Sequence, residues 1–210
     1  RHRTALVRYK LSQPVNLLIR HGLLTKTKTF FDFGCGRGDD LNGLQQGKFE
    51  AQGWDPHYAP DNPHVKSDIV NLGFVLNVIE SPEERAGALK KAWSLAQETL
   101  AVAVMTPSSD AIENSKPYGD GFLTSRGTFQ KYFMQEQFRE YVRQTIDEDP
   151  IAIAPGIFFV FRDKLVEQTF LLERHNRHRY QAVNIRPDRQ RPTATTKPLK
   201  TDVLRPQLEQ

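Results

Sequence analysis

The feature that most constrains this chain is a glycine-rich turn at residues 30–40, which read Phe-Phe-Asp-Phe-Gly-Cys-Gly-Arg-Gly-Asp-Asp. The apolar residues before it predict a short buried strand, and the acids after it suit the first turn of a helix. Glycines at 34, 36 and 38 let the backbone turn sharply and approach a ligand, because they carry no Cβ. A helix start adds unpaired N–H groups and a partial positive charge. We therefore expect a strand–turn–helix unit that binds a ligand at its turn.

The spacing of the glycines separates two classes of ligand. A dinucleotide-binding turn has the spacing G-x-G-x-x-G, and Asp39 occupies its last glycine position here. The observed pattern, Asp-x-Gly-x-Gly-x-Gly from Asp32, instead resembles the first motif of class I methyltransferases that use S-adenosyl-L-methionine (SAM). An NAD-dependent oxidoreductase is therefore disfavoured. A glycine-rich turn that binds nothing is the remaining alternative.

The resemblance implies a role for each residue of the turn. The carboxylate of Asp32 would meet the cationic amino-acid end of SAM. The backbone that would contact the cofactor belongs to Gly34, Cys35, Gly36 and Gly38. A helix start favours the thiolate form of Cys35, but this cysteine has no evident histidine partner, so we expect it to offer its backbone rather than its sulfur.

Two later acids and one further glycine extend the predicted cofactor site. Asp55 follows the turn by about twenty residues, where the second strand of a βαβ unit should end and an acid can hydrogen-bond ribose hydroxyls. Because Asp-Pro also initiates turns, a structural role for Asp55 fits the same position. Asp68 flanks the next predicted strand and is a candidate for reaching the adenine, with a plain strand-flanking role as the alternative. Gly73 belongs to the same predicted site.

Alternating apolar and helical patterns predict an α/β fold. Strands are expected at 29–33, 50–54, within 68–79 and at 100–105, and helices at 39–46, from Ser81 to about 97, at 127–146 and at 164–180. Thr124 or Ser125 is expected to cap the helix at 127–146. A hairpin is expected at 151–161, and the link at 56–63 is too short for a full helix. These elements predict a Rossmann-like, doubly wound class I methyltransferase sheet, mostly parallel, with an antiparallel hairpin at one edge.

The expected organisation is a helical extension at 1–28, a SAM-binding domain at 29–165, a helix at 166–180 and a basic, flexible tail at 181–210. The net charge is +4, and the basic residues gather towards both ends, where they could contact phosphates; a solvated linker is the alternative for the tail. The single cysteine excludes an intrachain disulfide and a cysteine-based zinc site. No apolar run approaches the length of a membrane span. We expect a cytoplasmic protein without a metal or a membrane partner.

Residues 106–126 have no strong period and are expected to form a long loop over the acceptor. Tyr118 and Phe122 could stack on a base, and Lys116 and Arg126 could hold phosphates, although such a loop would equally cover a small acceptor. No catalytic base is assigned, because an activated methyl group chiefly needs an aligned nucleophile. Arg85 is expected on the surface of its helix.

Several segments in a fixed order resemble one narrower family, the methyltransferases associated with DNA phosphorothioation. The resemblance covers roughly residues 1–175 and is carried by the segments 1–6, 32–40, 53–56, 68–80, 121–126 and 158–163. It implies a SAM-dependent methyltransferase that acts on nucleic acid, with DNA favoured, alongside phosphorothioation-system proteins. A methyltransferase for a small molecule or a protein is one alternative. A non-catalytic subunit that binds SAM or DNA is another.

Overall fold

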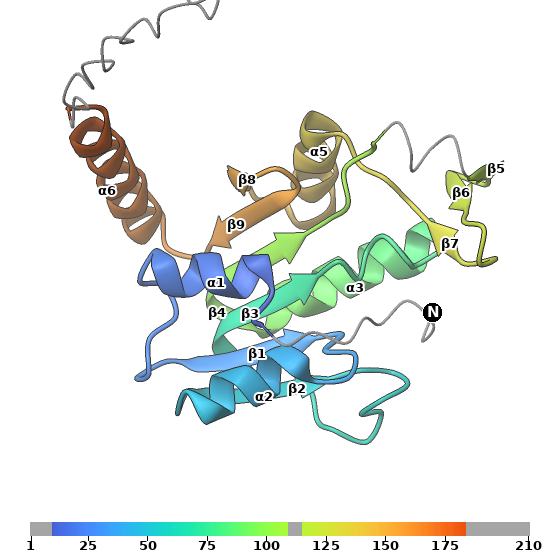
Figure 1. Cartoon of the computed structure of the whole chain (residues 1–210), viewed down its shortest axis with the longest axis horizontal. Helices are drawn as coiled ribbons and strands as arrows, with labels where there is room; N and C mark the ends of the chain where they lie inside the picture. Colours follow the sequence, from blue (N-terminus) through green and yellow to red (C-terminus); the bar gives the residue numbers. More distant parts are fainter. Residues whose placement is uncertain (1–9, 109–114, 184–210) are drawn as a thin grey trace, which may run out of the picture. The chain divides into compact units, whose positions relative to one another are not determined.

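The computed structural model describes residues 10–108 and 115–183, and these form a six-stranded main sheet in the order β2-β1-β3-β4-β9-β8 (Figure 1). The parallel strands are β1 (Thr29–Phe33), β2 (Glu50–Trp54), β3 (Ser67–Gly73) and β4 (Ala96–Ala103). At one edge β9 (Ile157–Phe161) pairs antiparallel with β4 and with β8 (Ile151–Ala154). The predicted doubly wound sheet with an antiparallel edge hairpin is therefore confirmed.

Helices cover both faces of this sheet (Figure 1). They are α1 (Gln13–Arg20), α2 (Asp39–Gln46), α3 (Pro82–Leu95) and α5 (Gln135–Ile146), and the chain continues after β9 into a further helix, α6 (Lys164–Val183). The helix α1 packs on β3 and β4, whereas α3 contacts β3, β4 and α5. Because side chains alternate along a strand, Phe31 and Val70 join the core under α3 and α5, together with Phe138. No helix in the described part of the chain is both long and apolar enough to cross a membrane.

The elements around the glycine turn follow their local sequence. The strands β1 and β2 and the helix α2 have the predicted bounds. The helix α3 begins with Pro82, and the hydroxyl of Ser81 accepts a hydrogen bond from the Glu84 N–H at 3.1 Å. None of residues 55–66 is helical, so the expected short link joins β2 directly to β3. Local capping and glycine chemistry therefore account for this half of the sheet.

The prediction for residues 106–146 was wrong in two respects. The expected loop contains β5 (Lys116–Tyr118) and β6 (Gly121–Leu123), which pair with β7 (Phe129–Gln130) in a separate antiparallel sheet, here called the small sheet. The expected helix at 127–146 begins only at Gln135. Thr124 caps no helix, because its N–H donates to the Thr128 carbonyl at 2.9 Å and closes a hairpin turn.

The chain divides after Gln168 into two compact units, so the rest of α6 belongs to the second unit. The predicted extension at 1–28 and tail at 181–210 reach beyond the described residues, since 1–9 and 184–210 lie outside them. Most of the basic residues at the two ends of the sequence fall in these ranges. The exceptions are Lys10, Arg20 and the basic residues within α6.

Candidate functional site

The carboxyl ends of β1 and β3 bring an acid and an amide together. Asp32 lies opposite Asn71 in the parallel register, and its side chain is only 4% exposed. The Asn71 Nδ2 donates a hydrogen bond to the Asp32 Oδ1 at 2.8 Å. The other amide atom, Asn71 Oδ1, is buried and has no hydrogen-bond partner among the described residues. Asn71 lies within the strand expected at 68–79, but it was not among the predicted cofactor residues.

The glycine turn behind Asp32 needs its glycines for conformational reasons. Gly34, Gly36 and Gly38 have φ values of +88°, +56° and +78°, a region that side chains with a Cβ rarely adopt. A Cβ on Gly34 would also overlap the side chain of Val75, which follows β3. The turn therefore brings the backbone of β1 against the loop after β3.

Asp55 ties the loop after β2 to the glycine turn. Its Oδ2 accepts a hydrogen bond from the Gly36 N–H at 3.0 Å. Its Oδ1 accepts from the N–H groups of His57 and Tyr58, both at 2.9 Å. This arrangement supports the structural role that Asp-Pro suggested. It also places the carboxylate beside the glycine turn.

Cys35 lies inside the turn with its thiol buried. Burial, followed by the charges of Asp32 and Asp55, raises the pKa of the Cys35 thiol to about 12. The sulfur is therefore protonated at neutral pH and is a poor nucleophile. The Cys35 N–H donates to the Trp54 carbonyl at 3.0 Å, so this residue also joins the turn to β2.

Asp68 does not belong to this site, so the predicted adenine contact is wrong. It is the second residue of β3, and its Oδ2 accepts hydrogen bonds from the N–H and the hydroxyl of Thr29, both at 2.8 Å. Thr29 begins β1, so this contact lies at the amino ends of the strands, away from the glycine turn. Gly73 is the last residue of β3, at the carboxyl end where Asp32 and the glycine turn lie. A Cβ on Gly73 would stand 3.0 Å from the Asn71 Nδ2.

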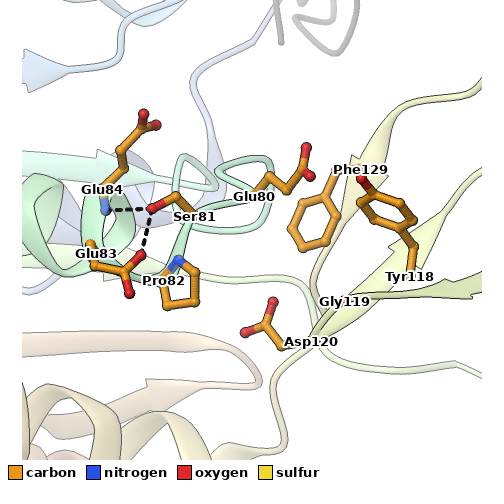
Figure 2. Close-up of a pocket in the computed structure, with 9 residues that line it drawn as sticks. All are labelled: Glu80, Ser81, Pro82, Glu83, Glu84, Tyr118, Gly119, Asp120 and Phe129. Carbon is orange, nitrogen blue, oxygen red and sulfur yellow. Dashed lines mark hydrogen bonds between the residues drawn. The ribbon is translucent and has the colours of Figure 1, made fainter.

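A second feature is a cavity of about 560 Å³ between the start of α3 and the small sheet (Figure 2). Its lining residues are Glu80, Ser81, Pro82, Glu83, Glu84, Tyr118, Gly119, Asp120 and Phe129. Figure 2 shows the Asp120 carboxylate extending from the β5–β6 turn towards the start of α3. Four carboxylates line this cavity, and one of them, Asp120, is paired with Arg85 and Lys131.

Of the four predicted acceptor residues, only Tyr118 lines this cavity. Its side chain is 45% exposed, and a hydrogen bond with the Glu80 carboxylate raises the pKa of the Tyr118 phenol. Phe122 is half-buried on the small sheet, with its ring 5.8 Å from that of Tyr132. Arg126 is exposed in the β6–β7 turn. The structure therefore places Phe122 and Arg126 on the small sheet but outside the cavity lining.

Arg85 was predicted on the helix surface, and that prediction was wrong. It is 2% exposed, and its guanidinium pairs with both carboxylate oxygens of Asp120 at 2.7 and 3.0 Å. Hydrogen bonds from Arg85, more than those from Lys131, hold the pKa of Asp120 below its usual range. The sequence gives little indication of this ion pair, because Asp120 lies 35 residues from Arg85.

Within residues 10–108 and 115–183, no group of three His, Cys, Asp or Glu side chains has the arrangement needed to hold a metal ion. The groups that the glycine turn and the neighbouring strand ends offer a ligand are carboxylates, an amide and glycine backbone.

No sequence-family model and no curated protein matches this chain, but solved structures do. The 1,6-didemethyltoxoflavin-N1-methyltransferase of Burkholderia thailandensis has a TM-score of 0.54 at 11% identity, over 70% of this chain and 76% of its own. CalS10, an amino pentose methyltransferase from Micromonospora echinaspora, has a TM-score of 0.53 at 14% identity, over 72% and 90%. DesVI of Streptomyces venezuelae has a TM-score of 0.51 at 12% identity, over 71% and 92%.

At these identities the likeness establishes the fold. The chain has the Rossmann-like fold of SAM-dependent methyltransferases. The narrower resemblance to phosphorothioation-associated proteins stays a prediction.

Proposed function

We propose that this protein is a SAM-dependent methyltransferase. The observation that carries the proposal is the convergence of Asp32, the glycine turn and Asp55 at the carboxyl ends of β1 and β2. Ligands of open α/β sheets bind at this edge. Two of the similar proteins support the choice of cofactor, since CalS10 was solved with SAM and the Burkholderia enzyme with S-adenosylhomocysteine.

The residues at this edge fit SAM. Its amino-acid end carries an ammonium group, which needs several hydrogen-bond acceptors. Asp32 supplies a carboxylate, and the buried Asn71 Oδ1 is an acceptor with no partner among the described residues. The Asn71 amide is oriented by the carboxylate, because its NH₂ group must face Asp32 and its oxygen must face away. Gly34 and Gly73 leave the neighbouring backbone without side chains.

Bound SAM supplies a methyl group already activated by its sulfonium, so the chain's main task is to hold and align. Asp32 would bind the ammonium group, and Asp55 would accept a hydrogen bond from the ribose. Cys35 keeps its proton, because burial and two neighbouring carboxylates raise its pKa to about 12. A protonated thiol does not compete with the acceptor for the methyl group.

For the acceptor, the geometry favours a small molecule without phosphate groups. The cavity beside Tyr118 is lined by Glu80, Glu83, Glu84 and Asp120. These four carboxylates outnumber the two cations that pair with Asp120, so their charges oppose a polyanion. DNA is the second candidate, supported by the exposed side chains of Lys116, Tyr118 and Arg126 on the small sheet. The association with phosphorothioation proteins and the non-catalytic role rest on the sequence resemblance alone.

Calorimetric titration with SAM, S-adenosylhomocysteine and NAD tests the cofactor. We expect SAM and its product to bind, NAD not to bind, and Asp32→Asn to weaken SAM binding by about tenfold or more, because a charged hydrogen bond is lost. The control is Asp149→Asn, which changes an exposed aspartate that pairs only with Arg139 and Arg143 in the described structure. Binding of NAD instead of SAM would sink the proposal.

The acceptor classes separate by salt dependence. If DNA binds the small sheet, its affinity should fall steeply with added salt, and the double substitution of Lys116 and Arg126 by Gln should flatten that slope. If the protein does not bind DNA, or if these substitutions do not change its affinity for DNA, the small molecule is the acceptor that remains.

A further inference from the structure

We propose that Arg85 is a positioning residue that fixes the small sheet against α3 and thereby holds Tyr118 at the cavity. This inference rests on the proposed function, because it treats the cavity as the acceptor side of a methyltransferase. It gives a role to a buried cation that the cofactor site does not use.

The guanidinium of Arg85 joins the backbone just before α3 to the side chain of Asp120. Its Nε and Nη2 donate to the Ile79 carbonyl at 3.1 and 2.9 Å, and Nη2 also donates to the Glu80 carbonyl at 3.1 Å. Its Nη1 and Nη2 bind the two oxygens of Asp120, which lies in the turn between β5 and β6. A planar fork with this many donors is specific to arginine, since a lysine ammonium cannot form the bidentate pair.

The pair with Asp120 connects the small sheet to α3. Asp120 is two residues from Tyr118 and directly after Gly119, and all three line the cavity. The Arg85 guanidinium also lies over the Phe129 ring of β7, 5.9 Å from its centre. One buried cation in α3 therefore contacts the small sheet at two places, the β5–β6 turn and β7.

A second set of contacts anchors the same sheet through Lys131, which follows β7. Its Nζ donates to the Asp120 carbonyl at 2.7 Å, and its N–H donates to the Asn77 carbonyl at 2.7 Å. The buried Asn77 donates from Nδ2 to the Lys131 carbonyl and accepts from the Met105 N–H at 3.0 Å. The small sheet is therefore held at Asp120 and at Lys131, rather than only by its chain connections. Residues 116–130 therefore form a sheet anchored by these contacts, whereas the sequence predicted a loop.

Hydrogen exchange on the full chain tests the role of Arg85. We expect Arg85→Lys and Asp120→Asn each to speed exchange about tenfold or more in residues 116–130, while β1 and β4 exchange as in the wild type. The double variant should add little to either single change, because the two residues act as one pair. The matched control is Arg139→Lys with Asp149→Asn, an exposed pair at 3.3 Å.

The titration of Tyr118 adds a readout that a general loss of stability would not move. The Tyr118 signal, assigned with Tyr118→Phe in ¹³C-tyrosine NMR spectra, should titrate at lower pH in Arg85→Lys, because its contact with Glu80 is lost. Asp120 is 40% exposed on a turn, so Asp120→Asn keeps the test open if the Arg85 variant does not fold. Unchanged exchange and an unchanged Tyr118 titration in a folded variant would overturn the inference.

The same variants separate this inference from the proposed function. SAM affinity should stay within about twofold of the wild type in both, since neither residue touches the glycine turn. If the wild type binds no SAM, the proposed function fails, whereas the exchange and titration data still decide the role of Arg85.

Discussion

At the scale of single residues, Gly34 and Gly87 show that glycine has different roles in this chain. Gly34 has a φ of +88°, and a Cβ there would overlap Val75. Gly87 lies inside α3, and no atom stands within 4 Å of the Cβ that it lacks. Only the first position requires glycine, so the two can be compared in a matched experiment.

We expect Gly34→Ala to lower the free energy of unfolding by about 1–3 kcal/mol, because the residue would keep a strained backbone and press on Val75. Gly87→Ala should raise it by about 0.5–1 kcal/mol, because alanine favours the helix. Urea denaturation measures both changes. Equal effects at the two positions would contradict the account of the turn.

Cys35 provides a second prediction at this scale. Its thiol is buried, and its pKa is raised to about 12, so alkylation by iodoacetamide should be slow at pH 8 and still rise with pH above pH 10. Asp32→Asn removes one of the charges that raise this pKa and should speed alkylation. Mass spectrometry of the folded protein gives the rate, with the urea-unfolded protein as the fast control. Rapid modification of the folded wild type would show that the thiol is ionised.

At the scale of elements, the small sheet was missed because its strands are only two or three residues long. Strands this short have no measurable alternation of apolar residues, and their pairing partners lie across turns. The hairpin at 151–161 was found because two apolar runs, at 151–154 and 157–161, flank the turn signal Pro155-Gly156. The small sheet depends instead on contacts to α3 and to the loop before it.

These contacts predict a pH dependence for the small sheet. The pKa of Asp120 is lowered, so its ion pair with Arg85 is complete above the ordinary aspartate pKa of about 3.9 and is lost as the pH falls through the lower folded value. The groups facing Asp120 are Arg85 and Lys131, with Glu80, Glu83, Glu84 and Tyr118 around the same cavity.

We expect the ¹³C carboxyl signal of Asp120 to titrate below pH 3.9, and Arg85→Lys to move its midpoint upwards. Residues 116–130 should lose exchange protection over the same interval. A midpoint at or above the ordinary value would contradict the pairing.

At the scale of the whole molecule, the acids of the parallel sheet fall into two groups, one at the carboxyl ends of the strands and one at the amino ends. Asp32 and Asp55 lie at or just beyond the carboxyl ends of their strands, whereas Asp68 binds Thr29 at the amino ends. All three are acids near strand ends in the sequence, and they differ in which end of the strand they occupy. That difference separates the candidate cofactor residues, at the carboxyl ends, from a structural residue at the amino ends.

Asp68→Ala should accordingly destabilise the fold without changing cofactor binding. We expect a loss of about 1–3 kcal/mol in the free energy of unfolding, because the Thr29 N–H and hydroxyl lose their acceptor. The affinity for SAM should stay the same within about twofold. Urea denaturation and calorimetry on one preparation measure both quantities, and a weakened SAM affinity in the folded variant would return Asp68 to the site.

The sequence by itself determined the elements whose signals lie within a few residues. The glycine turn follows from positive φ values at Gly34, Gly36 and Gly38. The helix α3 begins after its cap, Ser81, whose hydroxyl accepts a hydrogen bond from the Glu84 N–H. Only the tertiary structure decided which side chains meet. Asn71 reaches Asp32 across 39 residues and Arg85 reaches Asp120 across 35, and neither pair has a local pattern. Strand order and burial bring such residues together, because they depend on the packing of the whole sheet rather than on the backbone preferences of any one segment.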